Sequence, residues 1–167
     1  MKKIHIIRHA KSSWKDKSLE DIERPLNKRG VKTCEFMAEP VYRAGCCFDH
    51  VYCSPAVRAQ LTIELISKNL PDLFFHWQIE KELYTFDHQG LIQWFRSVDE
   101  NISEILIIGH NPALTDLSNT LGDRSIKNIP TCGYVQLVAR KDFLWNEITR
   151  GSFETRTMLW PKKLRGQ

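Results

Sequence analysis

The segment ILIIGHNP at residues 105–112 shows most clearly the pattern of strand, polar turn and helix start that decides the fold. Its apolar run before Gly109 predicts a buried strand, because it is nearly continuous and rich in isoleucine. Asn111 and Pro112 follow, and a capping residue followed by proline is typical of a helix start. The apolar residues of that helix recur at helical spacing: Leu114, Leu117 and Leu121. The stretch therefore predicts a strand, a polar turn and an amphipathic helix.

A strand followed by a polar turn, and then by a helix or a loop, is expected twice more toward the N-terminus. Residues 4–7, with the sequence IHII, predict a buried strand. Residues 50–53 predict a short strand, and Ser54 and Pro55 are expected to open a helix in which Ser54 is the cap. Short apolar strands that alternate with helices indicate an α/β fold with a largely parallel sheet.

The remaining segments extend this pattern. A helix is expected from Asn27, as its cap, to about Glu39, with Pro40 kinking or ending it. Another helix is expected from Gln89 to about Val98. Three more strands are predicted, at residues 75–79, 134–139 and 145–149. The last segment, residues 156–167, is interpreted as a basic tail packed by Met158, Leu159 and Trp160.

Length and composition point to a single soluble domain over residues 1–167. A chain of 167 residues fits one domain, and 42% hydrophobic with 26% charged residues is ordinary for a globular protein. The apolar runs are too short to cross a bilayer, and the start lacks the long apolar region and cleavage site of a signal peptide. These features predict a cytoplasmic protein that is not bound to a membrane.

Cysteines and charge narrow the classes of function. The five cysteines form no CxxC pair and their number is odd, which argues against a disulfide framework and a zinc site. Because no cluster has metal-ligand spacing, we expect neither a metal nor a cofactor. The net charge of +4 suits an anionic substrate, but no basic stripe with interleaved aromatic residues predicts nucleic-acid binding.

Polar residues follow three of the predicted strands: Arg8 with His9, Arg58 and His110. The carboxyl ends of parallel strands form a common ligand crevice, so we expect these side chains to converge. A neutral imidazole is a good nucleophile toward phosphorus, and arginine forks match the oxygens of a phosphoryl group. Arg58 would lie in the first turn of a helix, where free N–H groups also favour an anion. Protonated His110 would donate to a third oxygen, which predicts electrostatic stabilisation of a phosphoryl transition state.

These residues lie in motifs that resemble those of the histidine phosphatase superfamily, which includes the phosphoglycerate mutases. The motifs are IIRHA at 6–10, SPAVRAQLT at 54–62 and GHNP at 109–112. A fourth, ERPLNKRG at 23–30, resembles the Arg-Pro-Leu-Thr-x-x-Gly stretch of small SixA-type phosphohistidine phosphatases. The resemblance extends from residue 4 to about 161. It implies a three-layer α/β/α sandwich with a mainly parallel central sheet, like that of phosphoglycerate mutase.

The resemblance also implies roles by position. His9 would be the phosphorylated nucleophile, with Arg8, Arg58 and His110 forming the phosphate pocket and no metal involved. Arg24, which matches an arginine of the SixA-type stretch, either faces this pocket or forms a salt bridge within its loop.

One segment departs from the pattern of the family. Many members place a glutamate acid after the third strand, whereas this chain has Tyr84 at about that position. Glu82 and Asp87 are the nearby carboxylates and the candidates for a proton donor. A site without a dedicated acid suits a labile phosphoramidate such as phosphohistidine.

The expected function is dephosphorylation of phosphohistidine on a protein through a phosphohistidine enzyme intermediate. One alternative is a small-molecule phosphomonoesterase of the same superfamily. Another is a noncatalytic module that binds phosphate or a phosphoprotein, although such a module would not need the nucleophile His9. The expected partner is thus a phosphorylated protein or a small phosphorylated substrate, and the oligomeric state stays open.

Overall fold

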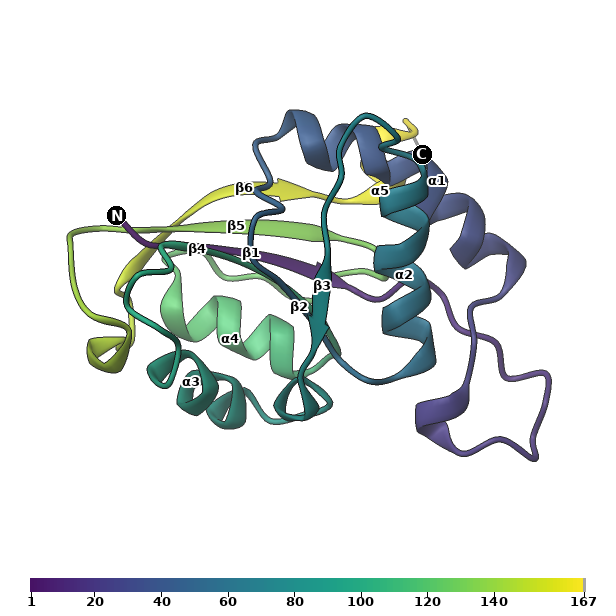
Figure 1. Cartoon of the computed structure of the whole chain (residues 1–167), viewed down its shortest axis with the longest axis horizontal. Helices are drawn as coiled ribbons and strands as arrows, with labels where there is room; N and C mark the ends of the chain where they lie inside the picture. Colours follow the sequence, from purple (N-terminus) through teal and green to yellow (C-terminus); the bar gives the residue numbers. More distant parts are fainter. Residues whose placement is uncertain (167) are drawn as a thin grey trace.

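The computed structural model describes residues 1–166. Its centre is a six-stranded sheet in the order β3-β2-β4-β1-β5-β6 (Figure 1). The strands are β1 (Lys3–Arg8), β2 (Val51–Cys53), β3 (Trp77–Ile79), β4 (Glu104–Gly109), β5 (Tyr134–Ala139) and β6 (Phe153–Leu159). Strands β1 to β4 are parallel, and β5 pairs antiparallel with both β1 and β6. The predicted α/β fold with a mainly parallel sheet is therefore confirmed.

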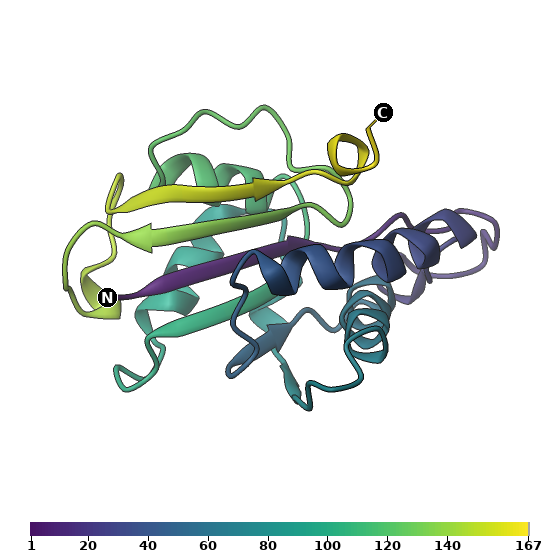
Figure 2. The ribbon, with the colours of Figure 1, turned by 90° about the horizontal axis from the view of Figure 1, so that it is seen from above.

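Helices cover both faces of this sheet. They are α1 (Lys28–Arg43), α2 (Val57–Lys68), α3 (His88–Arg96), α4 (Ala113–Leu121) and α5 (Pro161–Leu164), with short 3-10 helices η1 (Asp21–Glu23), η2 (Lys81–Leu83) and η3 (Trp145–Glu147). Helices α1 and α2 lie on one face, and α3 and α4 lie on the other (Figures 1 and 2). The result is the expected three-layer sandwich.

Two hydrophobic cores explain why β1 and β4 have continuous apolar sequences. Ile4 and Ile6 pack in the core beneath α3 and α4, whereas Ile7 packs in the core beneath α1 and α2. The same alternation divides the residues of β4 between the two cores. A strand covered on both faces needs mostly apolar residues, which produces a nearly continuous run. The exception in β1 is His5, which is buried and hydrogen-bonded to Tyr134 and Glu104.

The register of the strands brings the predicted site residues to one edge. Arg8 at the end of β1 pairs with Gly109 at the end of β4, and Cys53 at the end of β2 pairs with Ile108. The N–H of His9 donates to the carbonyl of Gly109 at 3.1 Å. The residues that follow these three strands therefore lie side by side.

Two predicted helix boundaries are wrong. The helix after β2 begins at Val57, and Ser54 does not cap it. Helix α1 is capped by Asn27 as expected, since its side chain accepts from the N–H of Gly30, but the helix continues past Pro40 to Arg43. Val41 in this last turn is fully buried, and its packing stabilises the turn despite the missing N–H of the proline.

Two predictions in the C-terminal part are also wrong. Residues 145–149 do not form a strand, because η3 and its neighbours occupy them. The buried Trp145, whose indole N–H donates to the carbonyl of Ile102 at 2.8 Å, explains their apolar character. Residues 156–159 belong to strand β6 and residues 161–164 to α5, so the expected tail is ordered structure. Residue 167 of that segment lies outside the described residues.

Among the described helices, none combines the length and apolarity that a membrane crossing requires.

Candidate active site

His9 lies directly after β1, with 8% of its surface exposed. Its Nδ1 is 2.7 Å from the carbonyl oxygen of Ala10. A carbonyl can only accept a hydrogen bond, so Nδ1 carries the proton and donates it. The lone pair of the imidazole therefore resides on Nε2, which is the atom available for nucleophilic attack.

The environment of His9 keeps its imidazole neutral. Burial lowers the pKa of His9 to about 4, and the positive charges of Arg58 and Arg8 act in the same direction, against the hydrogen bond to Ala10. At pH 7 the ring is thus deprotonated at Nε2. A buried neutral imidazole beside several cations can attack an anionic phosphoryl group that those cations bind.

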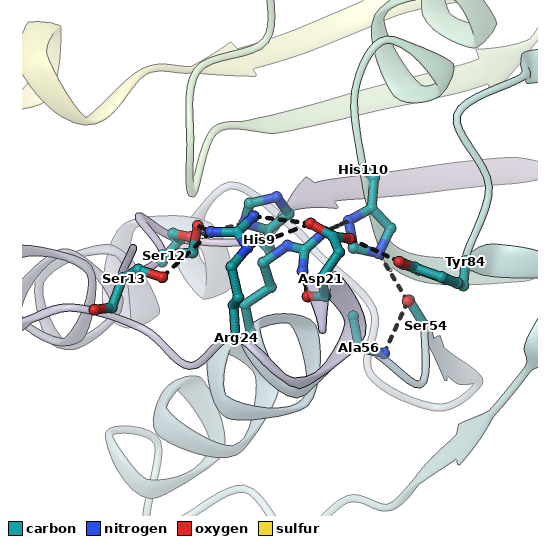
Figure 3. Close-up of polar contacts among 11 residues, drawn as sticks. His9, Ser12, Ser13, Asp21, Arg24, Ser54, Ala56, Tyr84 and His110 are labelled. Carbon is teal, nitrogen blue, oxygen red and sulfur yellow. Dashed lines mark hydrogen bonds and ion pairs between the residues drawn. The ribbon is translucent and has the colours of Figure 1, made fainter. Parts of the chain in front are cut away.

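His110 follows β4 and faces His9, with 5.1 Å between the two ring centroids. Its Nδ1 is 3.4 Å from Nη2 of Arg58, and its Nε2 is 2.8 Å from Oγ of Ser54 (Figure 3). A guanidinium can only donate, so Nδ1 accepts and the Nε2–H donates to Ser54. Ser54, which was expected to be a helix cap, is instead the hydrogen-bond partner that orients His110.

His110 is also neutral in this arrangement. Burial lowers its pKa to about 3, with further lowering from His9 and Arg58. His110 would be protonated, as expected from the sequence, only when the negative charge of a bound phosphoryl group raises its pKa.

The two arginines of the predicted pocket approach the histidines from different elements. Arg58, in the first turn of α2, is 2% exposed and contacts His110 directly. Arg8, the last residue of β1, is half-buried, and its Nη1 donates to the carbonyl of Ile129 at 2.9 Å. The charge of Arg8 lowers the pKa of both histidines. The structure thus brings Arg8, His9, Arg58 and His110 together at one edge of the sheet.

A carboxylate that the sequence analysis did not single out reaches this site. Asp21 of η1 accepts from Nη2 of Arg58 at 3.0 Å and from the hydroxyl of Tyr84 at 2.6 Å (Figure 3). Its backbone carbonyl accepts from Nη1 of Arg58 at 2.6 Å. Asp21 therefore occupies donors of Arg58 that a phosphoryl group would use. The sequence signal for it is an acid placed three residues before Arg24, within reach of an i,i+3 ion pair.

The charge of Asp21 is strongly stabilised. Partial burial raises the pKa of its carboxyl group, but the hydrogen bonds from Tyr84 and Arg58 and the charge of Arg58 outweigh burial. The net result is a pKa well below the usual range. Asp21 is therefore an anion at neutral pH and has no proton to donate to a leaving group.

Arg24 forms the salt bridge within its loop that was one of the two roles expected for it. It is buried, and its guanidinium donates to Asp21 at 3.1 Å and to Oγ of Ser12 at 2.7 Å. The exposed Trp14 stacks on the guanidinium, with 3.5 Å between Cζ and the ring centroid. Its charge also contributes to the low pKa of His9. Arg24 thus fixes its loop and adds positive potential at the nucleophile.

The structure does not bring the two candidate proton donors to His9. Asp87 is exposed and caps α3, accepting from the N–H of Gln89 at 2.9 Å. Glu82 is exposed and lines a hollow beside Glu80. Within residues 1–166, neither carboxylate hydrogen-bonds to the histidines. Tyr84 does approach, with its ring edge-on to His110 and 5.4 Å between centroids.

The positive charge at this site comes from side chains of the chain itself. Among residues 1–166, no group of three or more His, Cys, Asp or Glu side chains is arranged to hold a metal ion. Arginine forks and histidine N–H donors can bind the oxygens of a phosphoryl group while Nε2 of His9 faces phosphorus. The site therefore combines a neutral imidazole with cations that are able to bind an anion.

Comparison with known proteins identifies the family of this chain. The model of the histidine phosphatase superfamily (branch 1) matches residues 4–93, and the chain belongs to this superfamily. An uncharacterized chloroplastic protein of Arabidopsis thaliana is 28% identical over 83% of this chain and 66% of its own length. An uncharacterized protein of Mycobacterium tuberculosis is 29% identical over 78% of this chain and 85% of its own length.

Solved structures show the same fold. A protein histidine phosphatase SixA, in complex with tungstate, superposes with a TM-score of 0.78 at 20% identity, over 97% of this chain and 99% of that chain. A candidate phosphohistidine phosphatase SixA from Agrobacterium tumefaciens has the same TM-score and identity, over 96% of this chain and 98% of that chain. The phosphoglycerate mutase-like architecture thus extends over nearly the whole chain.

Proposed function

We propose that this protein is a phosphatase that removes the phosphoryl group from phosphohistidine on a protein substrate, through a phosphoenzyme formed at His9. One observation carries the proposal: His9 is neutral and has its Nε2 lone pair free, beside arginines that can bind the phosphoryl oxygens. Membership of the histidine phosphatase superfamily supports phosphatase chemistry at this site.

The proposed reaction has two displacements. Nε2 of His9 attacks phosphorus in line, the P–N bond of the substrate breaks, and its electron pair returns to the imidazole nitrogen of the leaving group. Water then attacks phosphorus of phospho-His9 and the P–Nε2 bond breaks, with its electron pair returning to Nε2. The protons of the water leave with inorganic phosphate. Arg8, Arg58 and His110 would stabilise the charge of both transition states.

The environment of Asp21 supports a phosphoramidate as substrate. An alkyl ester releases a poor leaving group and usually needs a positioned acid, which contributes about 10²–10⁴-fold in rate. Asp21 is held anionic by Arg58 and Tyr84, so it does not provide that proton. An imidazole that carries a proton on its ring departs without such help. The SixA structure described as a protein histidine phosphatase is consistent with this choice.

A substrate panel tests the proposal. The purified protein should hydrolyse a phosphohistidine peptide and an aryl phosphate far faster than an alkyl phosphate. Efficient turnover of simple alkyl phosphates, abolished in Glu82→Gln or Asp87→Asn, would contradict the proposal and favour a small-molecule phosphomonoesterase. Phosphate binding without any turnover would favour the noncatalytic module.

The proposal includes a cytoplasmic location, which stays a prediction. The five cysteines are unpaired thiols in the structure, as a reducing compartment would maintain them.

A further inference from the structure

A second cavity lies beside the active site, between α1, α5 and the segment 128–131. Its volume is about 480 Å³, a size typical of ligand pockets. Figures 1 and 2 show α5 at the same end of the molecule as α1, above the sheet edge where β1 ends. Five of the side chains that line this cavity are cations: Lys11, Arg29, Lys162, Lys163 and Arg165.

The fold builds this cavity through two close contacts. Gly30 in the first turn of α1 lies so near the chain at Lys11 that an added Cβ would overlap the carbonyl oxygen of Lys11, at 2.2 Å. This approach places Arg29 and Lys11 on the same wall. At the other end, the guanidinium of Arg165 lies over the ring of Phe36 at 4.7 Å and joins α5 to α1.

The cations of the cavity are not balanced by acids. All five are exposed, and within residues 1–166 none of them makes an ion pair. Among residues 1–166, no acidic side chain lines the cavity. Trp160, Pro130 and Pro161 add apolar surface to the lining of the cavity. Several cations close together raise the local positive potential, and a bound anion would reduce the electrostatic repulsion between them.

Two of the segments that line the cavity are close to active-site residues in the chain or through hydrogen bonds. Lys11 is two residues after His9, and Thr131 precedes Cys132, whose N–H lies within 3.1 Å of the carbonyl oxygen of His9. Arg8 donates to the carbonyl of Ile129 in the same segment. A substrate whose phosphoryl group reaches His9 therefore has its neighbouring groups close to this cavity.

We propose that this cavity binds acidic residues that flank the phosphohistidine of the protein substrate, an inference that rests on the proposed function. Exposed lysine and arginine side chains are long and flexible, so they can pair with carboxylates at several positions of a bound segment. Recognition of an acidic segment requires this. The cavity is thus a specificity site, distinct from the site that binds the phosphoryl group itself.

The test uses two synthetic phosphohistidine peptides of equal length. One carries aspartates beside the phosphohistidine, and the other carries asparagines at the same positions. Wild-type protein should prefer the acidic peptide in kcat/KM by roughly threefold to tenfold, mainly through KM, since exposed charge pairs contribute modestly. In Lys162→Gln/Lys163→Gln this ratio should fall to about one.

A matched control separates local from overall charge. Lys141→Gln/Arg150→Gln removes the same charge from exposed residues in the segment between β5 and β6, at the opposite edge of the sheet. This variant should keep the wild-type preference. A wild-type protein that hydrolyses both peptides equally well, or a control variant that loses the preference, would overturn the inference and leave the proposed function intact.

A binding measurement keeps the inference testable even if neither peptide is hydrolysed, a result that would count against the proposed function. The unphosphorylated acidic peptide is titrated into ¹⁵N-labelled protein while the indole N–H of Trp160 is observed. A saturable shift of this signal, lost in Lys162→Gln/Lys163→Gln, is expected. If the peptide produces no shift, the assignment of the cavity to a protein segment is overturned. The same holds if pyrophosphate produces a shift and the peptide does not.

Discussion

Asp21 and a phosphoryl group compete for the same donors of Arg58. The carboxylate and the backbone carbonyl of Asp21 accept hydrogen bonds from both terminal nitrogens of that guanidinium. A substrate oxygen that uses these same N–H groups must displace the contacts with Asp21. Tyr84 and Arg24 hold the same carboxylate, so the displacement has a cost.

Asp21→Asn should strengthen binding of anions. Removing the negative charge leaves Arg58 and Arg24 with fewer competing acceptors, so the inhibition constant of inorganic phosphate should fall by roughly threefold to tenfold. Asp72→Asn, at an exposed residue outside the site, is the control and should have no effect. Weaker phosphate inhibition in Asp21→Asn would show that Asp21 supports anion binding instead of opposing it.

The pKa of His9 predicts the acid side of the pH profile. His9 must be neutral to attack, and its pKa of about 4 keeps it neutral at pH 5 to 7. We expect kcat/KM for an aryl phosphate, corrected for the second ionisation of the substrate, to stay level down to about pH 5 and to fall below it. A fall centred near pH 6.5, the ordinary value for histidine, would contradict the described environment of His9.

At the scale of elements, features that follow from a run of similar residues could be predicted from the sequence. Features that depend on a single long-range contact could not. Strands β1 and β4 could be predicted because burial on both faces favours nearly continuous apolar runs. The helix start at Val57 could not, because Ser54 has the chemistry of a cap but bonds to His110, which is 56 residues away. The segment around Trp145 was misread for a similar reason, since a core contact and a strand both favour apolar residues.

A substitution of Gly30 tests how α1 is held against the loop that follows β1. Gly30→Ala would place Cβ at 2.2 Å from the carbonyl oxygen of Lys11, so α1 or the loop must move. We expect a loss of about 1–3 kcal/mol in the free energy of unfolding, measured by urea denaturation. Gly90→Ala in α3 is the control, because its Cβ would meet Thr85 at an ordinary 3.5 Å and should not destabilise the protein. Equal stability of the two variants would contradict the close contact.

At the scale of the whole molecule, the site depends on strands that are far apart in the sequence but end together. Three strand ends could be expected to converge because parallel strands share one carboxyl edge, and this placed Arg8, His9, Arg58 and His110. Asp21 was missed because it lies on a 3-10 helix in a long loop, where no periodic pattern predicts which way a side chain points. Its role depends on Tyr84, a contact between residues 63 positions apart.

In the proposed reaction, the arginines around His9 would supply the positive charge that a metal ion supplies in other phosphatases. Hydrolysis of an aryl phosphate should therefore persist, within about twofold, after exhaustive dialysis against chelator. The control is the same dialysed protein with added magnesium or zinc, which should restore nothing because nothing is lost. Strict dependence of activity on the added ion would show that the described side chains are insufficient.

The central claim is covalent catalysis by His9, and trapping the phosphoenzyme tests it most directly. Wild-type protein mixed rapidly with ³²P-labelled substrate and quenched in alkali should carry acid-labile label on His9. His9→Ala should lose the label and at least about 10³-fold of the turnover, whereas His76→Ala, at an exposed histidine, should keep both. Full turnover in His9→Ala, or label on another residue, would contradict the account.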